Sequence, residues 1–322
     1  MAVPAVAQLG GKRSFEFLNV PNHGRLGALG GVNVSLADRD VNFFYSNPTL
    51  VSDTLAEWAS ASYQVYVADI GQTTVSYAHR FGRFGTVAFG VQHMSYGSIK
   101  MYDSYGQDIG DVKSGETALV VSKSHHIGNF RFGVNLKGLF SNIAGYRANA
   151  VVADVGGAFV HPKNNLTVGL VIKNLGVIFS DYSPTSSSKL PFDVQLGTTF
   201  KPEHMPLRFS VTGYNLTKSD VLYYDAQSGM DKPGAFDQIF RRLNFGAEIL
   251  IHKNVNLMVG YNYLIHQELK LSNGGGGAGV AFGFSARIKS VELVVSRNGY
   301  VAGNGGYTFT VSLNTQKILT RR

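Results

Sequence analysis

Alternation of apolar and polar side chains with a period of two runs through most of this 322-residue chain, and it constrains the fold more than any other feature. In residues 243–251, for example, every odd-numbered position is apolar, whereas the even-numbered positions include Asn244, Gly246 and Glu248. Successive side chains of a strand point to opposite faces, so this pattern indicates a strand with one apolar and one polar face. Fourteen such segments follow one another from Trp58, and they begin near residues 58, 71, 84, 115, 129, 147, 165, 190, 206, 241, 254, 278, 291 and 305.

The connections between these segments differ in length in a regular way. Short turns fall at 81–83, 126–129, 161–165, 202–205, 252–254 and 288–290, and longer connections fall at 103–114, 179–189, 217–240 and 266–277. An outer-membrane barrel has an even number of strands, short periplasmic turns and longer outer loops. The sequence therefore predicts an all-β fold: a 14-stranded antiparallel transmembrane β-barrel in the cell outer membrane, with long loops outside and both termini periplasmic. A soluble all-β protein is the alternative, and it would need no detergent.

The composition agrees with this prediction. Charged residues make up 16% of the chain, aromatic residues make up 12%, and there are 38 glycines. A soluble domain usually has roughly 25% charged residues. No apolar run reaches the roughly 18 residues of a helical span. The chain has no cysteine, which excludes disulfides, thiol catalysis and cysteine-based zinc sites.

Four regions follow from these patterns. Ala5-Val6-Ala7 fits the A-x-A pattern of a signal-peptide cleavage site, so we interpret residues 1–7 as a signal-peptide remnant, with a chance alanine-rich start as the alternative. Residues 8–57 are broken by many glycines, and we predict that they form an N-terminal hatch segment inside the barrel. Residues 58–314 form the barrel, and residues 315–322 form a basic periplasmic tail.

Charges are sorted between the two ends of the predicted barrel. Basic residues gather at the short turns and in the tail, so the net charge of +8 does not argue for nucleic-acid binding. Solvated ends with a random bias would give the same asymmetry. We take the acidic residues of the longer loops as candidate partner-facing positions: Asp103, Asp108, Asp111, Asp220, Asp225, Asp231 and Asp237.

One turn can be predicted in detail. If Lys289 and Ser290 form a two-residue turn, strand pairing sets Arg287 opposite Glu292 on the lumen side. An ion pair across two strands is sensible polar filling inside a barrel. A pair that reads a substrate is the functional alternative.

Motifs typical of enzymes lack their usual context. Gly274, Gly276 and Gly279 match G-x-G-x-x-G, but no βαβ unit surrounds them. Ser186 and Lys189 match S-x-x-K, but the S-D-N and K-T-G partner motifs are missing. We therefore expect that the chain is not an enzyme and that it has no catalytic residue, no cofactor and no metal site.

The N-terminal region carries a more specific signal. Residues 24–50 read GRLGALGGVNVSLADRDVNFFYSNPTL, and they resemble the N-terminal hatch signature of the FadL-like outer-membrane family, G-x-A-x-A-D-D…N-P-A-G-L. The residues that carry this resemblance are Gly27, Gly30, Gly31, Asp38, Asp40, Asn47 and Pro48. The glycines permit close backbone approach, and Asn-Pro initiates a turn.

A second resemblance covers nearly the whole chain, from about Gly10 to Asn314. The ordered segments FFYSNPTLVSDTL (43–55), FGVNLKG (132–138), LVIKNLG (170–176) and LPFDVQLG (190–197), together with residues 66–97, are similar to the PorQ-like barrels of the Bacteroidetes type IX secretion system. This resemblance implies an anchor without catalysis, which holds the surface protein PorZ beside PorU and PorV in an attachment complex. That complex joins secreted cargo to anionic lipopolysaccharide, which this chain would contact only indirectly.

A different function remains open at this point. Other FadL-like proteins suggest a channel for uptake or export of hydrophobic small molecules, which needs an apolar tunnel. The alternation instead places charged side chains on lumen faces: Arg131, Lys137, Lys173, Arg208, Glu248 and Arg287.

Overall fold

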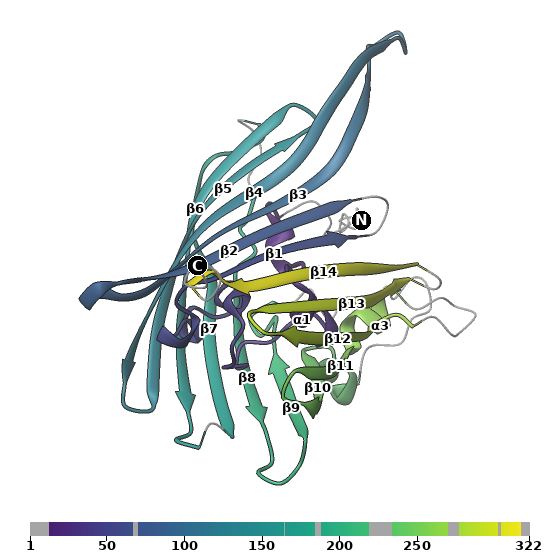
Figure 1. Cartoon of the computed structure of the whole chain (residues 1–322). Coiled ribbons are helices and arrows are strands. Elements are labelled where there is room, and N and C mark those ends of the chain that lie inside the picture. Colours follow the sequence, from purple (N-terminus) through teal and green to yellow (C-terminus); the bar gives the residue numbers. More distant parts are fainter. Residues whose placement is uncertain are drawn as a thin grey trace.

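The computed structural model describes residues 13–66, 70–163, 165–183, 188–218, 234–269, 277–301 and 304–316. Within these ranges fourteen antiparallel strands form one closed barrel, in which each strand pairs with its sequence neighbours and β1 closes on β14 (Figure 1). The predicted 14-stranded antiparallel barrel is confirmed. No helix in the described ranges is long and apolar enough to cross a membrane.

The strands begin close to the predicted positions. Their bounds are β1 Trp58–Val65, β2 Gly71–Phe81, β3 Gly85–Tyr102, β4 Asp108–Ile127, β5 Phe130–Ile143, β6 Tyr146–Val160, β7 Leu166–Ser180, β8 Asp193–Phe200, β9 Leu207–Gly213, β10 Leu243–His252, β11 Val255–Asn262, β12 Val280–Ile288, β13 Val291–Val301 and β14 Asn304–Asn314. Short helices are η1 Glu16–Asn19, α1 Gly24–Ala28, η2 Val41–Tyr45, η3 Pro48–Leu50, η4 Asp53–Leu55, η6 Gly82–Phe84, α2 Ala235–Phe240 and α3 Tyr263–Leu269.

One predicted loop is largely a strand. The region 103–114 was expected to connect two strands, but β4 already begins at Asp108, so Asp108 and Asp111 lie in a strand. Ile99 pairs with Val112 and Tyr102 pairs with Asp108, so only residues 103–107 turn the chain. The resulting β3–β4 hairpin extends beyond its neighbours at one end of the barrel (Figure 1). Burial no longer alternates along this part of β3, because most side chains on both of its faces are exposed.

Alternation along each strand decides which side chains face outward. On β5, Phe132, Val134 and Leu136 are exposed, whereas the intervening Asn135 and Lys137 are buried. The same order holds on β10, where Asn244 and Glu248 are buried and Ile249 is exposed. An apolar outer face toward lipid and a polar inner face are the arrangement that a membrane barrel requires.

The two mouths of the barrel differ in their connections. We call the short-turn mouth the end that carries 82–84, 128–129, 161–165, 201–206, 253–254 and 289–290, and the long-loop mouth the opposite end. β1 begins and β14 ends at the short-turn mouth, because the strand number is even and neighbours are antiparallel. That this mouth faces the periplasm stays a prediction.

Candidate functional site

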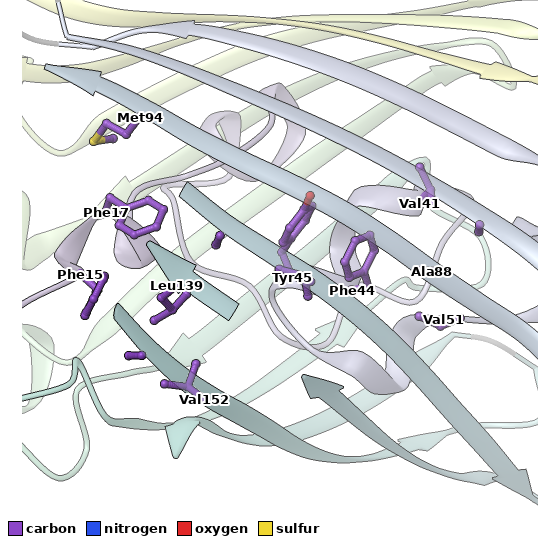
Figure 2. Packing of buried hydrophobic residues seen from close by; sticks show 14 of the residues in the cluster. Phe15, Phe17, Val41, Phe44, Tyr45, Val51, Ala88, Met94, Leu139 and Val152 are labelled. Carbon is purple, nitrogen blue, oxygen red and sulfur yellow. The ribbon is translucent and has the colours of Figure 1, made fainter. Parts of the chain in front are cut away.

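The N-terminal segment, residues 13–57, lies inside the barrel and runs past most of its wall (Figure 1). Its helix α1 packs against β11 to β14, and η3 packs against β4, β5 and β6. Apolar side chains of η1 and η2 contact the inner faces of β2 to β6, and Figure 2 shows Phe15 and Phe17 near Leu139, and Phe44 and Tyr45 toward Ala88. The predicted position of this segment in the lumen is the geometry on which the functional proposal rests.

Glycines on the inner face of the wall make room for the backbone of the N-terminal segment. A Cβ atom at Gly260 would lie 2.1 Å from the amide nitrogen of Gly30. A Cβ at Gly133 would lie 2.6 Å from the carbonyl carbon of Pro48. Real Cβ contacts are never this short, so no other residue fits without displacing the segment. A Cβ at Gly169 would likewise lie 2.3 Å from the carbonyl oxygen of Val34, whereas Gly90, Gly156 and Gly283 make room for side chains of the segment, those of Tyr45, Asn47 and Ala28.

The glycines of the motif that resembles the FadL-like signature lie on the N-terminal segment, on the opposite side of its interface with the barrel wall. Gly27 approaches β13 so closely that a Cβ would lie 2.9 Å from Nδ2 of Asn298. Gly30 and Gly31 have φ of 88° and 91°, a region that residues with a Cβ rarely adopt. Asn244 secures this bend by donating to the carbonyl oxygens of Leu29 and Val32, at 2.8 and 2.7 Å.

Asn47 and Pro48 start η3 rather than ending the N-terminal segment. The side-chain oxygen of Asn47 accepts a hydrogen bond from the Thr49 amide at 3.1 Å, and Pro48 occupies the first helical position. Asn47 Nδ2 donates to the carbonyl oxygen of Val34 at 2.8 Å. The pair therefore joins two stretches of the N-terminal segment, which continues to the start of β1 at Trp58.

An ion network, buried at Arg25 and Glu248 and partly exposed at Asp38 and Arg208, ties the N-terminal segment to β9 and β10. Arg25 donates from Nε to Glu248 Oε1 at 2.8 Å and from Nη2 to Asp38 Oδ2 at 2.7 Å. Arg208 reaches the same two carboxylates, at 2.8 Å from Asp38 and 2.6 Å from Glu248. Burial alone would raise the pKa of Asp38, but Arg25 and then Arg208 hold that pKa well below its usual range. Two cations and two anions thus neutralise one another across 223 residues of sequence.

Asp40 and His23 form a second polar group beside this network. Asp40 Oδ1 accepts hydrogen bonds from both nitrogens of Asn42, each at 2.9 Å. Burial raises the pKa of the Asp40 carboxyl. His23 is fully buried with Nε2 3.7 Å from Asp40, and burial together with the nearby Arg25 lowers its pKa to about 3. The imidazole is therefore neutral at physiological pH.

A cavity lined by both polar and apolar side chains separates the N-terminal segment from the wall toward the long-loop mouth. Its volume is about 230 Å³, and Lys137, Lys173 and Asp193 are among its lining residues. Lys137 forms an ion pair with Asp154 at 2.7 Å, and both side chains are buried. The predicted lumen-facing charges thus do line the interior, and this cavity is not an apolar tunnel.

The structure brings Arg287 and Glu292 together. They are register partners across the Lys289-Ser290 turn, and Arg287 Nε donates to Glu292 Oε2 at 3.0 Å. Lys289 has φ of 56°, as a tight two-residue turn requires. The pair closes part of the lumen at the short-turn mouth.

Among the residues that the structure describes, the acidic loop positions do not gather into one site. Asp103 accepts backbone hydrogen bonds from Tyr105 and Gln107 within its own turn. Asp237 in α2 pairs with Arg241 at 2.7 Å. Asp220, Asp225 and Asp231 lie outside the described residues, as do residues 1–7 and most of the basic tail. Across the described part of the chain, no three metal-ligating side chains gather in one place.

Sequence reasoning missed two components of this site. Arg25 was not singled out, although it lies two residues before Gly27 in the segment that the resemblance highlighted. The wall glycines were also missed, and their signal was available: Gly133, Gly169 and Gly260 occupy inward positions of alternating strands, where polar filling is expected.

Comparison with known proteins places the fold in a class. No family model and no curated protein matches the chain. Two solved structures share its architecture. The CymD monoaromatic hydrocarbon channel is 12% identical, with a TM-score of 0.53, and the match covers 92% of this chain and 97% of that one. The TodX monoaromatic hydrocarbon channel, as a deltaS2 mutant, is 12% identical, with a TM-score of 0.51, and the match covers 91% and 98%.

The chain therefore has the fold of an outer-membrane β-barrel of the type seen in these two channels, which fits an integral outer-membrane protein. Omp33 of Acinetobacter baumannii also matches, at 7% identity and a TM-score of 0.40, over 80% of this chain and 98% of that one. At these identities the likeness shows the fold alone. The expectation that the chain is not an enzyme stays a prediction.

Proposed function

We propose that this chain is a plugged outer-membrane barrel that anchors a surface protein, with the N-terminal segment as its hatch. The observation that carries this proposal is the seating of the N-terminal segment inside the barrel. The segment is seated against glycines of the wall and bound through the ion network of Arg25, Asp38, Arg208 and Glu248. A hatch fixed in this way suits a static scaffold better than a gate.

The β3–β4 hairpin is the candidate docking element of the anchor. It extends beyond the neighbouring strands, and it exposes Tyr102 and Tyr105, which are 57% and 89% accessible. Exposed aromatic residues are common anchors at protein interfaces. The sequence resemblance suggests a PorZ-like partner in a type IX attachment complex with PorU and PorV, and lipopolysaccharide would be reached through those proteins.

Affinity capture from native outer membranes tests the anchor. The detergent-solubilised chain is isolated, and co-purifying proteins and lipids are identified by mass spectrometry. We expect stoichiometric recovery of a surface protein, which is lost when Tyr102→Ser and Tyr105→Ser are combined and retained in the control Tyr146→Ser. Tyr146 is also exposed near the long-loop mouth but begins a different hairpin. Recovery of the barrel without protein partners would overturn the anchor.

A channel for hydrophobic small molecules is the second candidate, and the fold comparisons favour it. Both CymD and TodX are described as monoaromatic hydrocarbon channels. The buried charged side chains of Lys137, Lys173 and Asp193 in the lining of the cavity speak against an apolar substrate. Extraction of bound small molecules from the purified barrel distinguishes the two functions: a stoichiometric apolar ligand and no protein partner would establish the channel.

A further inference from the structure

A recess at the short-turn mouth is lined by an excess of positive charge. Its volume is about 500 Å³, and it lies between the N-terminal segment and a wall formed by β5, β9 and the β6–β7 and β8–β9 turns. Five cationic residues line it, whereas its carboxylates are only Asp38 and Glu203. The cationic residues are Arg39, Arg131, Lys163, Lys201 and Arg208.

Two of these cations are already neutralised within the protein. Lys163 pairs with Glu203 at 3.5 Å, and Arg208 belongs to the ion network with Asp38. The charged groups of Arg39, Arg131 and Lys201 have no hydrogen-bond or ion-pair partner among the described residues. Three uncompensated cations thus surround one recess, and each comes from a different part of the chain.

The three cations face the recess rather than lipid. Arg131 lies on β5 between the exposed Phe130 and Phe132, so strand alternation turns it inward. Lys201 lies in the β8–β9 turn, directly after Phe200, and its side chain lines the recess. These residues therefore cannot serve simply as contacts to lipid headgroups on the outside of the barrel.

We propose that this recess binds an oxyanion ligand, a molecule that carries phosphate or carboxylate groups. Guanidinium groups offer paired donors that match the oxygens of either group, and an ammonium adds a compact charge. The two guanidinium groups and one ammonium converge from the N-terminal segment, β5 and the end of β8. A bound oxyanion would therefore bridge the N-terminal segment to the wall and stabilise its seated position.

The recess has room for more than a single anion. A second hollow of about 800 Å³ shares Arg39, Lys201 and Arg208 with it and continues past Lys253 toward Arg287. An extended ligand with several anionic groups would fit this continuous surface. Binding of such a ligand would weaken with added salt, because the groups are partly solvated.

The test uses the full-length purified protein in non-ionic detergent at low salt. Inorganic pyrophosphate and a hexaglutamate peptide serve as probes, and binding is measured by titration calorimetry. We expect at least one probe to bind and the combined Arg39→Gln, Arg131→Gln and Lys201→Gln variant to weaken that binding by about tenfold or more. Pyrophosphate alone would identify a phosphate ligand, hexaglutamate alone a carboxylate ligand, and binding of both the shared oxyanion chemistry.

The matched control removes three charges at the same mouth but outside the recess. It combines Arg80→Gln, Arg83→Gln and Lys123→Gln, which lie on β2, η6 and β4. We expect it to retain the affinity of the wild type. Equal losses in both variants, or no binding of either probe, would overturn the proposal.

A second measurement does not depend on the triple variant. Because the chain has no cysteine, Ser52→Cys places a single thiol in the lining of the recess. We expect the bound probe to slow modification of this thiol by a charged methanethiosulfonate reagent at least threefold. An unchanged rate at a probe concentration that saturates the calorimetric signal would place the probe elsewhere and contradict the proposal.

Discussion

The N-terminal segment is held on two sides of the barrel by different kinds of interaction. Toward β9 and β10, Arg25 and Asp38 enter an ion network with Arg208 and Glu248. Toward β2 to β6, apolar side chains such as Phe44 pack against the inner wall.

The comparison separates specificity from stability. A buried ion network offsets its own desolvation only when every partner is present, so it contributes more to position than to net stability. Apolar burial stabilises without demanding one geometry. Close approach to wall glycines is common to both sides, so the glycines set the distance and the two chemistries hold the segment there.

Removing both sides at once gives the largest expected effect. Deletion of residues 10–50 removes the ion network and most of the apolar side chains that fill the lumen. We expect a folded barrel, because its strands pair with one another, and a raised permeability to a large antibiotic. Antibiotic sensitivity of cells that carry the deletion measures this effect, and unchanged sensitivity would argue against a plug.

Obstructing only the apolar side is the next largest change. Gly133→Val would place a side chain within 3 Å of the backbone of Pro48 and Thr49. We call the N-terminal segment seated when it is packed in the lumen and released when it has left the lumen. We expect this substitution to raise the free energy of the seated state by more than about 4 kcal/mol relative to the released state. The reporter is Ser46→Cys, a buried position of the segment, labelled with a maleimide-polyethylene glycol too large to enter the lumen.

The control for this variant is Gly157→Val on the neighbouring strand. A Cβ at Gly157 meets nothing within 4 Å, because this residue points away from the lumen. Labelling of the reporter should rise strongly with Gly133→Val and stay at the wild-type level with Gly157→Val. Equal labelling in the two variants would show that the wall glycines do not seat the segment.

Disrupting only the ion network should reduce the seating free energy of the N-terminal segment somewhat less. Glu248→Ala leaves Arg25 and Arg208 to share Asp38, and we expect a loss of about 3–5 kcal/mol of seating free energy. The same thiol reporter measures it. The combination Arg25→Met with Glu248→Leu keeps the Asp38–Arg208 pair and removes the unbalanced charge. It should recover most of the loss, whereas no recovery would mean that the network contributes stability directly.

The barrel could be predicted from the sequence because alternation is a local property that lipid enforces on every strand. The prediction failed for the extension of β3 and β4, where Tyr102 pairs with Asp108 and burial no longer alternates along β3. The site was only partly predictable. The alternation did place Arg208 and Glu248 in the lumen, and the motif singled out Asp38. The ion network also needs Arg25, which contacts Glu248, a residue 223 positions away in the sequence. No local sequence pattern specifies such a contact.

Acidification should have the smallest effect on the seating of the N-terminal segment. It acts through His23, which lies beside the ion network. His23 has a pKa of about 3 in the seated segment and about 6.5 when exposed. As the pH falls below 6.5, the released segment takes up a proton that the seated segment does not, so seating weakens. The loss should reach about 1.4 kcal/mol at pH 5.5.

Asp40 acts in the opposite direction, and a variant separates the two groups. Because burial raises the pKa of Asp40, the seated segment takes up a proton there before the released segment does, which favours seating as the pH falls. His23→Gln removes the histidine contribution and leaves that of Asp40. We expect reporter labelling between pH 7.5 and 5.5 to rise in the wild type and to stay level or fall in the variant. A rise of equal size in both would assign the pH dependence to another group.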